Sequence, residues 1–194
     1  MIRTALVSAF LAAAFLTAPS LAQPRDNSAV VKAQEEAMRK LDFLVGRWEG
    51  EATFTLPGGR KESIRQSENV QPRIGGKVLL IEGAGRTTAG EQPGKLVFEA
   101  LATVSYDPAK KEYMMRAHGP EGLSVDPAFT VEDRAIRWGF SPAPSVEIRY
   151  DIRIDERGHW VETGDRSIDG GQTWTRFIEL DLERLSDGIP EPGR

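Results

Sequence analysis

Two charged residues of one short segment, Glu162 and Arg166, are of types that could hold the polar group of a ligand. Side chains of a strand alternate between its two faces, so Glu162, Gly164 and Arg166 share the face of Trp160. Burying a charge is costly unless the charge is paired or contacts a ligand. If that face is the interior, the two side chains either pair with each other or bind a polar head group. A change of register by one residue would instead place both in water.

Aromatic residues elsewhere in the chain could form the apolar walls of the same site. Tyr150 and Trp138 are candidates, although packing in a core is the commoner use of such side chains. Three further residues of the expected inner face, Tyr113, Met115 and Trp160, are also candidates. The candidate ligand-binding residues are therefore Tyr113, Met115, Trp138, Tyr150, Trp160, Glu162 and Arg166.

The residue types of a metal or catalytic centre are scarce. The chain has two histidines, His118 and His159, and no cysteine, and it lacks the His-Glu-x-x-His and calcium-loop spacings. It also lacks a Gly-x-Ser-x-Gly elbow and a phosphate loop. We therefore predict no metal site and no catalytic residue. The enzymatic alternative is a hydrolase with two carboxylates about 5–10 Å apart in a barrel mouth, one of them with a raised pKa.

Residues 167–174, SIDGGQTW, match the Asp-box pattern Ser-x-Asp-x-Gly-x-Thr-Trp, which recurs in sialidases and other propellers. A propeller needs several four-stranded blades, whereas this chain has one such box and about ten expected strands. We interpret the segment as a hairpin turn. The Asp169 carboxylate accepts hydrogen bonds from local backbone amides, Gly170 or Gly171 takes a positive φ, and Trp174 packs on the turn.

The elements that would position these residues are short strands. Beyond Gly46 the chain shows period-two runs broken by Gly, Pro, Asn and Asp about every ten residues. The clearest run, residues 146–155, alternates apolar and charged residues, which is typical of a strand with one buried face. We predict an all-β fold, a single antiparallel up-and-down β-barrel of about ten strands, near residues 47–56, 61–71, 77–87, 95–106, 111–118, 122–131, 134–140, 145–155, 159–168 and 173–185.

The turn at residues 155–159 sets the face of the segment that follows it. It fits a three-residue loop with Gly158 in the left-handed conformation. This pairing places Trp160 beside Ile154 and turns His159 outward.

The turn at residues 107–110 sets the faces of its two flanking segments, and its proline suits the second position of a type I turn. If Tyr106 pairs with Lys111, His118 faces solvent, so neither histidine is expected inside the barrel. The side chains expected inside are Phe98, Ala100, Ala102, Val104, Tyr113, Met115 and Ala117.

The N-terminal residues predict export. Arg3, the apolar residues 5–17 and the small residues around Ala22 are typical of a secretory signal peptide that is cleaved near Ala22, and the run is too short to span a bilayer. We therefore expect a periplasmic or secreted protein. The expected organisation is a signal peptide (1–22), a polar leader (23–28), a barrel domain (29–186) that begins with a helix (29–42) capped by Asn27 or Ser28, and a flexible tail (187–194).

The charge balance narrows the range of partners. The formal net charge is −4 and no cluster of Lys or Arg is present, so the chain has no electrostatic footprint for nucleic acid or for an anionic membrane surface. Because cysteine is absent, stability must come from a hydrophobic core rather than from disulfides. The sequence leaves the oligomeric state open.

The most specific signal is in residues 43–51, FLVGRWEGE, where Gly46-x-Trp48 opens the first strand after a short helix. It resembles the Gly-x-Trp of lipocalins and the Gly-x-Trp-x-Gly of the heme-binding nitrobindins. With Tyr106-Asp107-Pro108 and Asp169-Gly170-Gly171-x-x-Trp174, the chain is most similar to a lipocalin-like family of secreted bacterial proteins of unknown function, over about residues 40–185.

This resemblance implies a calycin-type barrel closed at one end. In lipocalins the tryptophan packs under an arginine of the last strand, and Trp48 and Arg184 would form that pair, with a cation–π contact of about 0.5–2 kcal/mol. The alternative role for Trp48 is to stack on a ligand. Nitrobindins hold heme iron through a histidine near the C-terminal strand, whereas no histidine follows His159 here.

We therefore predict an exported binding protein that holds a small, largely apolar molecule inside a β-barrel. No cofactor is predicted. The alternatives are a heme-binding nitrobindin-like barrel, a structural or partner-binding barrel with a filled core, and the hydrolase described above.

Overall fold

The computed structural model describes residues 27–90 and 93–186 of the 194-residue chain. The predicted signal peptide, residues 23–26 of the leader and the tail 187–194 lie outside the described residues. An α-helix, α1 (Ser28–Arg39), and a 3₁₀ turn, η1 (Asp42–Leu44), precede the strands. The strands are β1 (Gly46–Thr55), β2 (Lys61–Arg73), β3 (Val78–Thr87), β4 (Leu96–Asp107), β5 (Glu112–His118), β6 (Ser124–Val125), β7 (Ala128–Glu132), β8 (Ala135–Ala143), β9 (Val146–Ile154), β10 (Trp160–Ser167) and β11 (Thr175–Ser186).

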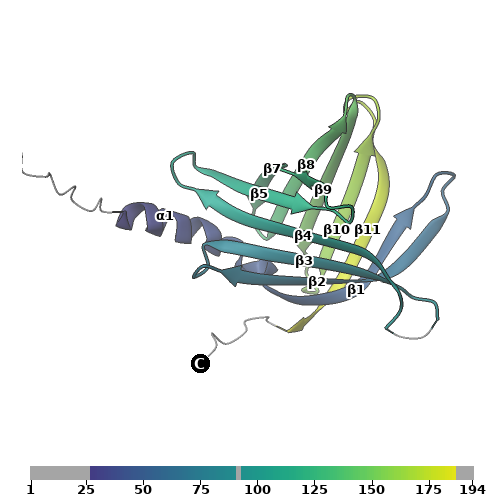
Figure 1. The fold of residues 1–194 in the computed structure, drawn as a ribbon, viewed down its shortest axis with the longest axis horizontal. Coiled ribbons are helices and arrows are strands. Elements are labelled where there is room, and N and C mark those ends of the chain that lie inside the picture. The colour runs from purple at the N-terminus through teal and green to yellow at the C-terminus, as the bar shows by residue number, and fades with distance from the viewer. Residues whose placement is uncertain (1–26, 91–92, 187–194) are drawn as a thin grey trace, which may run out of the picture.

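All of these strands belong to one antiparallel sheet in the order β6-β5-β4-β3-β2-β1-β11-β10-β9-β8-β7. Most strands that follow each other in the chain pair with each other in the sheet. The first strand, β1, also pairs with the last, β11. The sheet curls into a half-barrel whose edges are β6 and β7, and β5 lies close to β7 (Figure 1). The predicted all-β, antiparallel up-and-down fold with one short helix is confirmed.

The predicted strand near residues 122–131 is two strands instead of one. β6 pairs with β5, whereas β7 pairs with β8 at the opposite edge of the sheet. Pro127 lies between them, and proline has no N–H to donate to a ladder. The chain therefore changes from one edge of the sheet to the other at this position.

The β9–β10 hairpin has the predicted register. Trp160 pairs with Ile154, and the Asp155 N–H donates to the His159 carbonyl at 2.9 Å. Gly158 has φ +82°, a conformation that favours glycine. His159 faces outward, where its Nδ1 lies 2.6 Å from a carboxylate oxygen of Asp181.

The β4–β5 hairpin differs in register from the prediction, yet its faces are as predicted. Tyr106 pairs with Tyr113 rather than with Lys111, a shift of two residues. Because side chains alternate with a period of two, a shift of two residues leaves every side chain on its expected face. His118 accordingly lies beside Leu101 on the outer face.

The N-terminal helix packs against the barrel by its C-terminal half. Ala37 and Met38 are buried, and the Tyr113 hydroxyl donates to the Ala37 carbonyl at 2.8 Å. The helix ends at Arg39 instead of residue 42, and η1 covers the remaining residues. Asn27 occupies the N-cap position without a capping hydrogen bond from its side chain.

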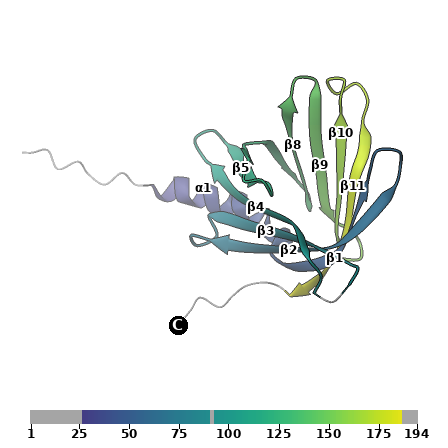
Figure 2. The same cartoon turned by 45° about the vertical axis from the view of Figure 1, so that its right-hand side comes forward.

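The hydrophobic core fills the end of the barrel beside α1 and η1. We call this region the closed half, defined by the buried side chains of Met38, Leu41, Leu44, Trp48, Val70, Leu79, Val104, Trp160 and Leu182. The other end is the open half, defined by inner-face side chains that remain half-buried: Phe54, Ile64, Phe98, Trp138, Phe140, Ile148, Tyr150 and Ile178. The hairpins of β1–β2, β8–β9 and β10–β11 diverge at this end (Figure 2).

Candidate ligand site in the barrel interior

Trp48 and Arg184 form the contact expected at the closed end. Gly46 opens β1 with φ +144°, and the Trp48 Nε1–H then donates to the Leu44 carbonyl at 2.9 Å. The Arg184 guanidinium lies 4.0 Å from the centre of the Trp48 ring. It also donates to the Val45 carbonyl and, at 2.7 Å, to the Phe43 carbonyl. Arg184 thus ties β11 to the chain that enters β1.

A polar cluster lies between the closed and the open half. Gln66 and Glu68 of β2 and Glu162 of β10 are buried on the inner face. The Gln66 amide donates to Glu68 Oε1 at 2.8 Å, and the Trp160 Nε1–H donates to Glu162 Oε2 at 3.1 Å. Each of the two carboxyl groups therefore has one neutral donor inside the barrel.

Burial changes the ionisation of both carboxyl groups. It raises the pKa of Glu68 to about 8, and the nearby Glu162 carboxylate raises it further. The hydrogen bond from Gln66 acts in the opposite direction and lowers this pKa. It raises the pKa of Glu162 to about 7, against the hydrogen bond from Trp160. Both shifts have the expected sign, because a low dielectric disfavours the charged form.

Glycines make room for the side chains of this cluster. A Cβ on Gly83 of β3 would lie 2.9 Å from Glu68 Oε1, so the carboxyl group occupies the space that a larger residue would fill. A Cβ on Gly164 of β10 would likewise lie 2.9 Å from the Tyr150 ring. The missing side chains let Glu68 and Tyr150 lie close to the opposing strands.

An aromatic wall extends from the cluster into the open half. The rings of Trp138 and Tyr150 are stacked with centroids 4.1 Å apart, and Phe140 continues the stack at 6.1 Å from Trp138. Phe177 meets Tyr150 edge-on at 5.8 Å. Burial, with the Glu162 carboxylate as a second cause, raises the pKa of Tyr150 above its ordinary value. Tyr150 therefore borders both the carboxyl groups and the aromatic wall.

Arg166 forms no ion pair with Glu162 in the described residues, so the first of the two arrangements considered for them does not occur. Arg166 lies opposite Ile148, as expected from the alternation of side chains along a strand, but it is exposed near the end of β10. A register shift between Gly164 and Asp165 disturbs the pairing with β11 just before this position. The strand end thus carries Arg166 to the rim of the open half.

Tyr113, Met115 and Trp160 lie in or beside the packed closed half instead of lining open space. Trp160 is 2 % exposed and contacts the Trp48 ring edge-on at 5.8 Å. Met115 is buried, and Tyr113 contacts Tyr106 edge-on at 5.1 Å. Of the seven predicted ligand-binding residues, the structure brings together Trp138, Tyr150 and Glu162.

Sequence reasoning missed Glu68 and Gln66. Residues 63–70 read Ser-Ile-Arg-Gln-Ser-Glu-Asn-Val, so polar residues stand on both faces of β2 and the alternation gives no clear inner face. The only sequence signal was that Ile64 and Val70 share a face with the two polar residues. This signal identifies the inner face only when the register of β2 against β1 is known, and the sequence does not give that register.

The Asp-box forms the turn between β10 and β11, away from the interior cluster. Asp169 Oδ1 accepts hydrogen bonds from the N–H groups of Gln172 and Thr173 at 3.0 and 2.9 Å. The hydrogen bond from the Thr173 hydroxyl, followed by that from the Thr173 N–H and others in the turn, lowers the pKa of Asp169 to about 2. Gly170 and Gly171 both have positive φ, and the Trp174 Nε1–H donates to the Gly171 carbonyl. The geometry is that of a turn, as predicted.

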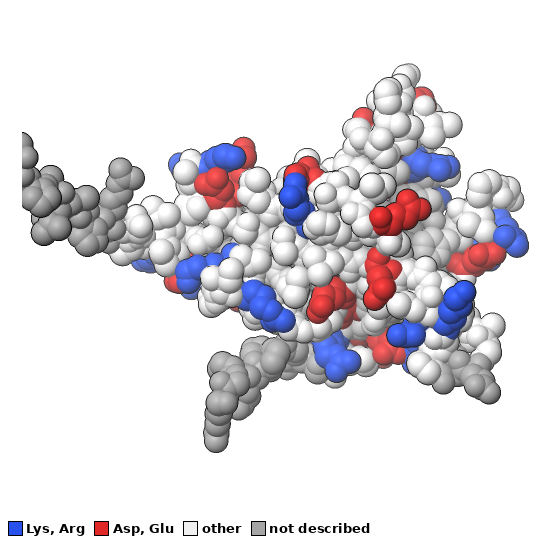
Figure 3. Space-filling model, viewed as in Figure 1, with Lys and Arg blue, Asp and Glu red and all other residues white. Residues whose placement is uncertain are grey.

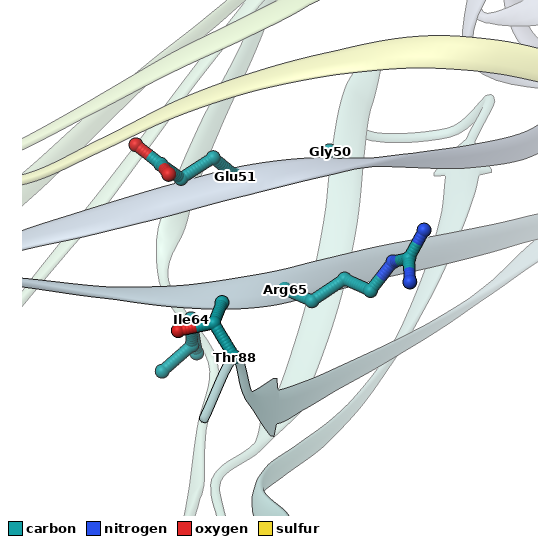
Figure 4. Close-up of a pocket in the computed structure, with 5 residues that line it drawn as sticks. All are labelled: Gly50, Glu51, Ile64, Arg65 and Thr88. Carbon is teal, nitrogen blue, oxygen red and sulfur yellow. The ribbon is translucent and has the colours of Figure 1, made fainter. Parts of the chain in front are cut away.

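The surface of the described residues carries two shallow hollows. One, of about 280 Å³, lies over β1, β2 and Thr88, and its lining includes Gly50 and Ile64 of the inner face. The side chains of Glu51 and Arg65 point away from each other there (Figure 4). The other, of about 440 Å³, lies over β2 to β5 beside His118. Charges of both signs are interspersed on the face shown in Figure 3. Neither hollow contains a predicted ligand-binding residue.

The residues of the interior do not fit a histidine-ligated heme. Both histidines of the chain are outside the barrel: His118 beside Leu101 and His159 beside Asp181. Within residues 27–90 and 93–186, no group of three or more His, Cys, Asp or Glu side chains is arranged to hold a metal ion. In the same residues, no helix has the length and apolar character needed to cross a bilayer.

Comparison with solved structures supports the fold. The crystal structure of Rv2717c from M. tuberculosis superposes with a TM-score of 0.55 at 18 % sequence identity, over 77 % of this chain and 97 % of that chain. No protein-family model and no curated protein sequence matches the chain. At this identity the likeness concerns the fold alone, and it is compatible with a calycin-like barrel.

Proposed function

We propose that the protein binds a small, largely apolar molecule in the open half of its barrel. The observation that carries this proposal is the contrast in burial along the inner face. The side chains that define the closed half are at most 2 % exposed, whereas the aromatic and aliphatic side chains of the open half stay half-buried. A ligand that covers this surface gains about 25 cal/mol for each Å² of apolar area removed from water.

The carboxyl groups and Tyr150 would orient such a ligand. Binding sites for small molecules are mostly apolar and hold a few polar groups that fix orientation. Glu68 and Glu162 lie at the base of the open half, next to the aromatic wall. Arg166 at the rim is a further polar contact for a ligand that reaches the mouth.

Binding is favoured over hydrolysis by the ionisation of the two acids. A two-carboxylate hydrolase uses one protonated acid and one carboxylate that stays ionised. Here burial raises the pKa of both Glu68 and Glu162, so no partner keeps either one ionised below neutral pH. A filled barrel that only binds a partner protein is the second alternative, and the experiment below separates it from ligand binding.

The place of action in this proposal is the periplasm or the outside of the cell. The support is the pattern of residues 1–22, with one basic residue, an apolar run and a small-residue site. N-terminal sequencing of the protein purified after export tests it, and the expected first residue is Gln23.

The test of ligand binding is a titration with N-phenyl-1-naphthylamine, a neutral fluorescent probe. Saturable binding is expected, and Ile64→Gln in the open half should weaken it about 3- to 10-fold, since about 1 kcal/mol of apolar contact is lost. Val97→Gln on the outer face is the matched control and should bind as the wild type does. A fluorescence signal that never saturates, or equal losses in both variants, would exclude a ligand site in the open half and favour the filled barrel.

A further inference from the structure

Glu68 and Glu162 are two acids inside the barrel without a cationic partner. Each residue is 9 % exposed. Among the described residues, no Lys, Arg or His nitrogen forms a salt bridge with either carboxyl group. Their hydrogen-bond donors are the neutral Gln66 amide and the Trp160 indole. A pair of acids in this setting lacks the positive charge that buried carboxylates ordinarily have.

One oxygen of each carboxyl group is available to a ligand. The hydrogen bonds from Gln66 and Trp160 reach Glu68 Oε1 and Glu162 Oε2, which leaves Glu68 Oε2 and Glu162 Oε1 without a donor. Every completely buried side-chain nitrogen or oxygen in the described part of the chain has a hydrogen-bond partner. The two remaining oxygens are therefore not completely buried, and each is an acceptor without a donor.

We propose that the apolar ligand of the barrel carries a protonated amine, and that Glu68 and Glu162 bind this amine at the base of the open half. This inference rests on the proposed function and names the chemical class of its ligand. An ammonium group has three N–H donors and no acceptor, which matches two acidic acceptors. An anionic head group would meet two acids, and a neutral one would leave their charge uncompensated when they ionise.

The neighbouring aromatic rings fit the same ligand. Tyr150 lies near Glu162, and Trp138 stacks on Tyr150 at 4.1 Å. Aromatic faces attract cations, and they also pack against the apolar body of an amine. The site thus has acceptors for the charged end of the ligand and rings for the remainder.

Binding of the amine should depend on pH through the two acids. Burial raises the pKa values of Glu68 and Glu162 to about 8 and about 7, so both are largely protonated at pH 5.5 and largely ionised at pH 9. A primary alkylamine has a pKa of about 10 and remains largely cationic over this range. Affinity for the amine should therefore rise as the pH rises through 7 and 8.

Few other titratable groups lie on the inner face of the described strands. The remaining charged groups that the strand registers place on this face are Glu62 and Arg166, both exposed at strand ends, and Arg184 over Trp48. Tyr150, Tyr106 and Tyr113 complete the set. The pKa of Tyr150 is raised, so this phenol stays neutral up to pH 9.

The experiment compares three fluorescent probes with the same dansyl group, each titrated into the protein purified after export. They are dansylcadaverine, which carries an amine, its neutral N-acetyl derivative, and a dansylated alkyl carboxylate. At pH 9 the amine should bind about tenfold more tightly than the neutral probe, which corresponds to a single charge-assisted contact. At pH 5.5 the two affinities should become similar, and the carboxylate probe should bind most weakly at pH 9.

Variants locate the effect. Glu68→Gln and Glu162→Gln should each remove most of the preference for the amine and keep the binding of the neutral probe. Glu62→Gln removes one negative charge at the rim and is the matched control, so it should keep the preference. If both interior variants fail to fold, the pH profile of the wild type decides.

The possible results separate this inference from the proposed function. If no probe binds with saturation, the proposed function fails. If the neutral probe binds as tightly as the amine at every pH, or if the carboxylate probe binds most tightly, the open half binds a ligand but the inference of an amine is overturned. An equal loss of preference in Glu62→Gln would also overturn it, because the charge would then act from the rim.

Discussion

The closed and open halves of the barrel are built from the same strands but differ in what covers their inner faces. In the closed half, α1, η1 and Arg184 cover the strand ends, and Trp48 and Leu182 are almost completely buried. In the open half the hairpins diverge (Figure 2), and Phe54 and Ile178 remain half-buried. The difference shows that a two-residue alternation defines an inner face, whereas the elements at the barrel ends decide whether that face becomes core or stays partly exposed.

The two halves also differ in the partners of their buried charged side chains. The cation of the closed half, Arg184, is satisfied by two carbonyl groups and the Trp48 ring. The acids at the base of the open half, Glu68 and Glu162, have neutral donors only. The arrangement around Arg184 stabilises the fold, because its guanidinium group has hydrogen-bond acceptors and an aromatic ring as partners. The arrangement around the two acids resembles a site that is completed by a ligand.

The largest expected effect concerns the closed half. Trp48→Ala should lower the free energy of unfolding by about 3–5 kcal/mol, because it leaves a cavity in the core and removes the ring under Arg184. Urea denaturation followed by circular dichroism measures this loss. An unchanged unfolding midpoint would show that Trp48 contributes to ligand contact rather than to the closure of the barrel.

The next effect concerns the two acids between the halves. Their pKa values are raised above the unfolded value, so the folded state binds protons more tightly, and its stability should fall as the pH rises from about 5 to about 8. For Glu162, a rise from 4.5 to about 7 corresponds to a loss on the order of 3 kcal/mol.

Urea denaturation at several pH values measures this dependence. The double variant Glu68→Gln and Glu162→Gln should show a flatter profile than the wild type between pH 5 and 8, since its side chains do not ionise. Glu62→Gln serves as the control and should keep the wild-type slope. Identical slopes in all three proteins would show that the acids are solvated and lie outside an apolar interior.

The smallest expected effect on stability concerns the open half. Trp138→Ala removes a half-buried ring, so it should cost about 1–2 kcal/mol of stability, less than Trp48→Ala. In return it should weaken binding of N-phenyl-1-naphthylamine at least as strongly as Ile64→Gln does. A loss of stability equal to that of Trp48→Ala, with probe binding unchanged, would remove the distinction between the two halves.

Particular residues show how far the sequence predicts this fold. The β9–β10 register was correct because a short loop with Gly158 allows few pairings. The β4–β5 register was two residues off, yet Tyr113 and Met115 were still placed inside, since the strand period is two. The single strand expected at residues 122–131 was wrong because the edge at which a short strand pairs depends on the closure of the whole sheet.

The candidate site was predicted less completely than the fold. Glu162 was identified from one strand, because a carboxyl group on an apolar face is visible in the local pattern. Glu68 was missed, because β2 carries polar residues on both faces. Arg166 was expected on the inner face with Glu162, and it keeps that face opposite Ile148, but the end of the strand leaves it exposed at the rim.

By itself the sequence determined the strand content, the turns and the faces of most strands, because these depend on neighbours in the chain and on the two-residue period. Only the tertiary structure decided which inner-face residues are core, that Glu68 and Glu162 interact across the interior, and which end of the barrel stays open. These properties arise from side chains of β2 and β10 that face the same interior, and from the packing of α1 against the sheet. Residues so far apart in the chain have no local sequence pattern that predicts which of them will lie close together.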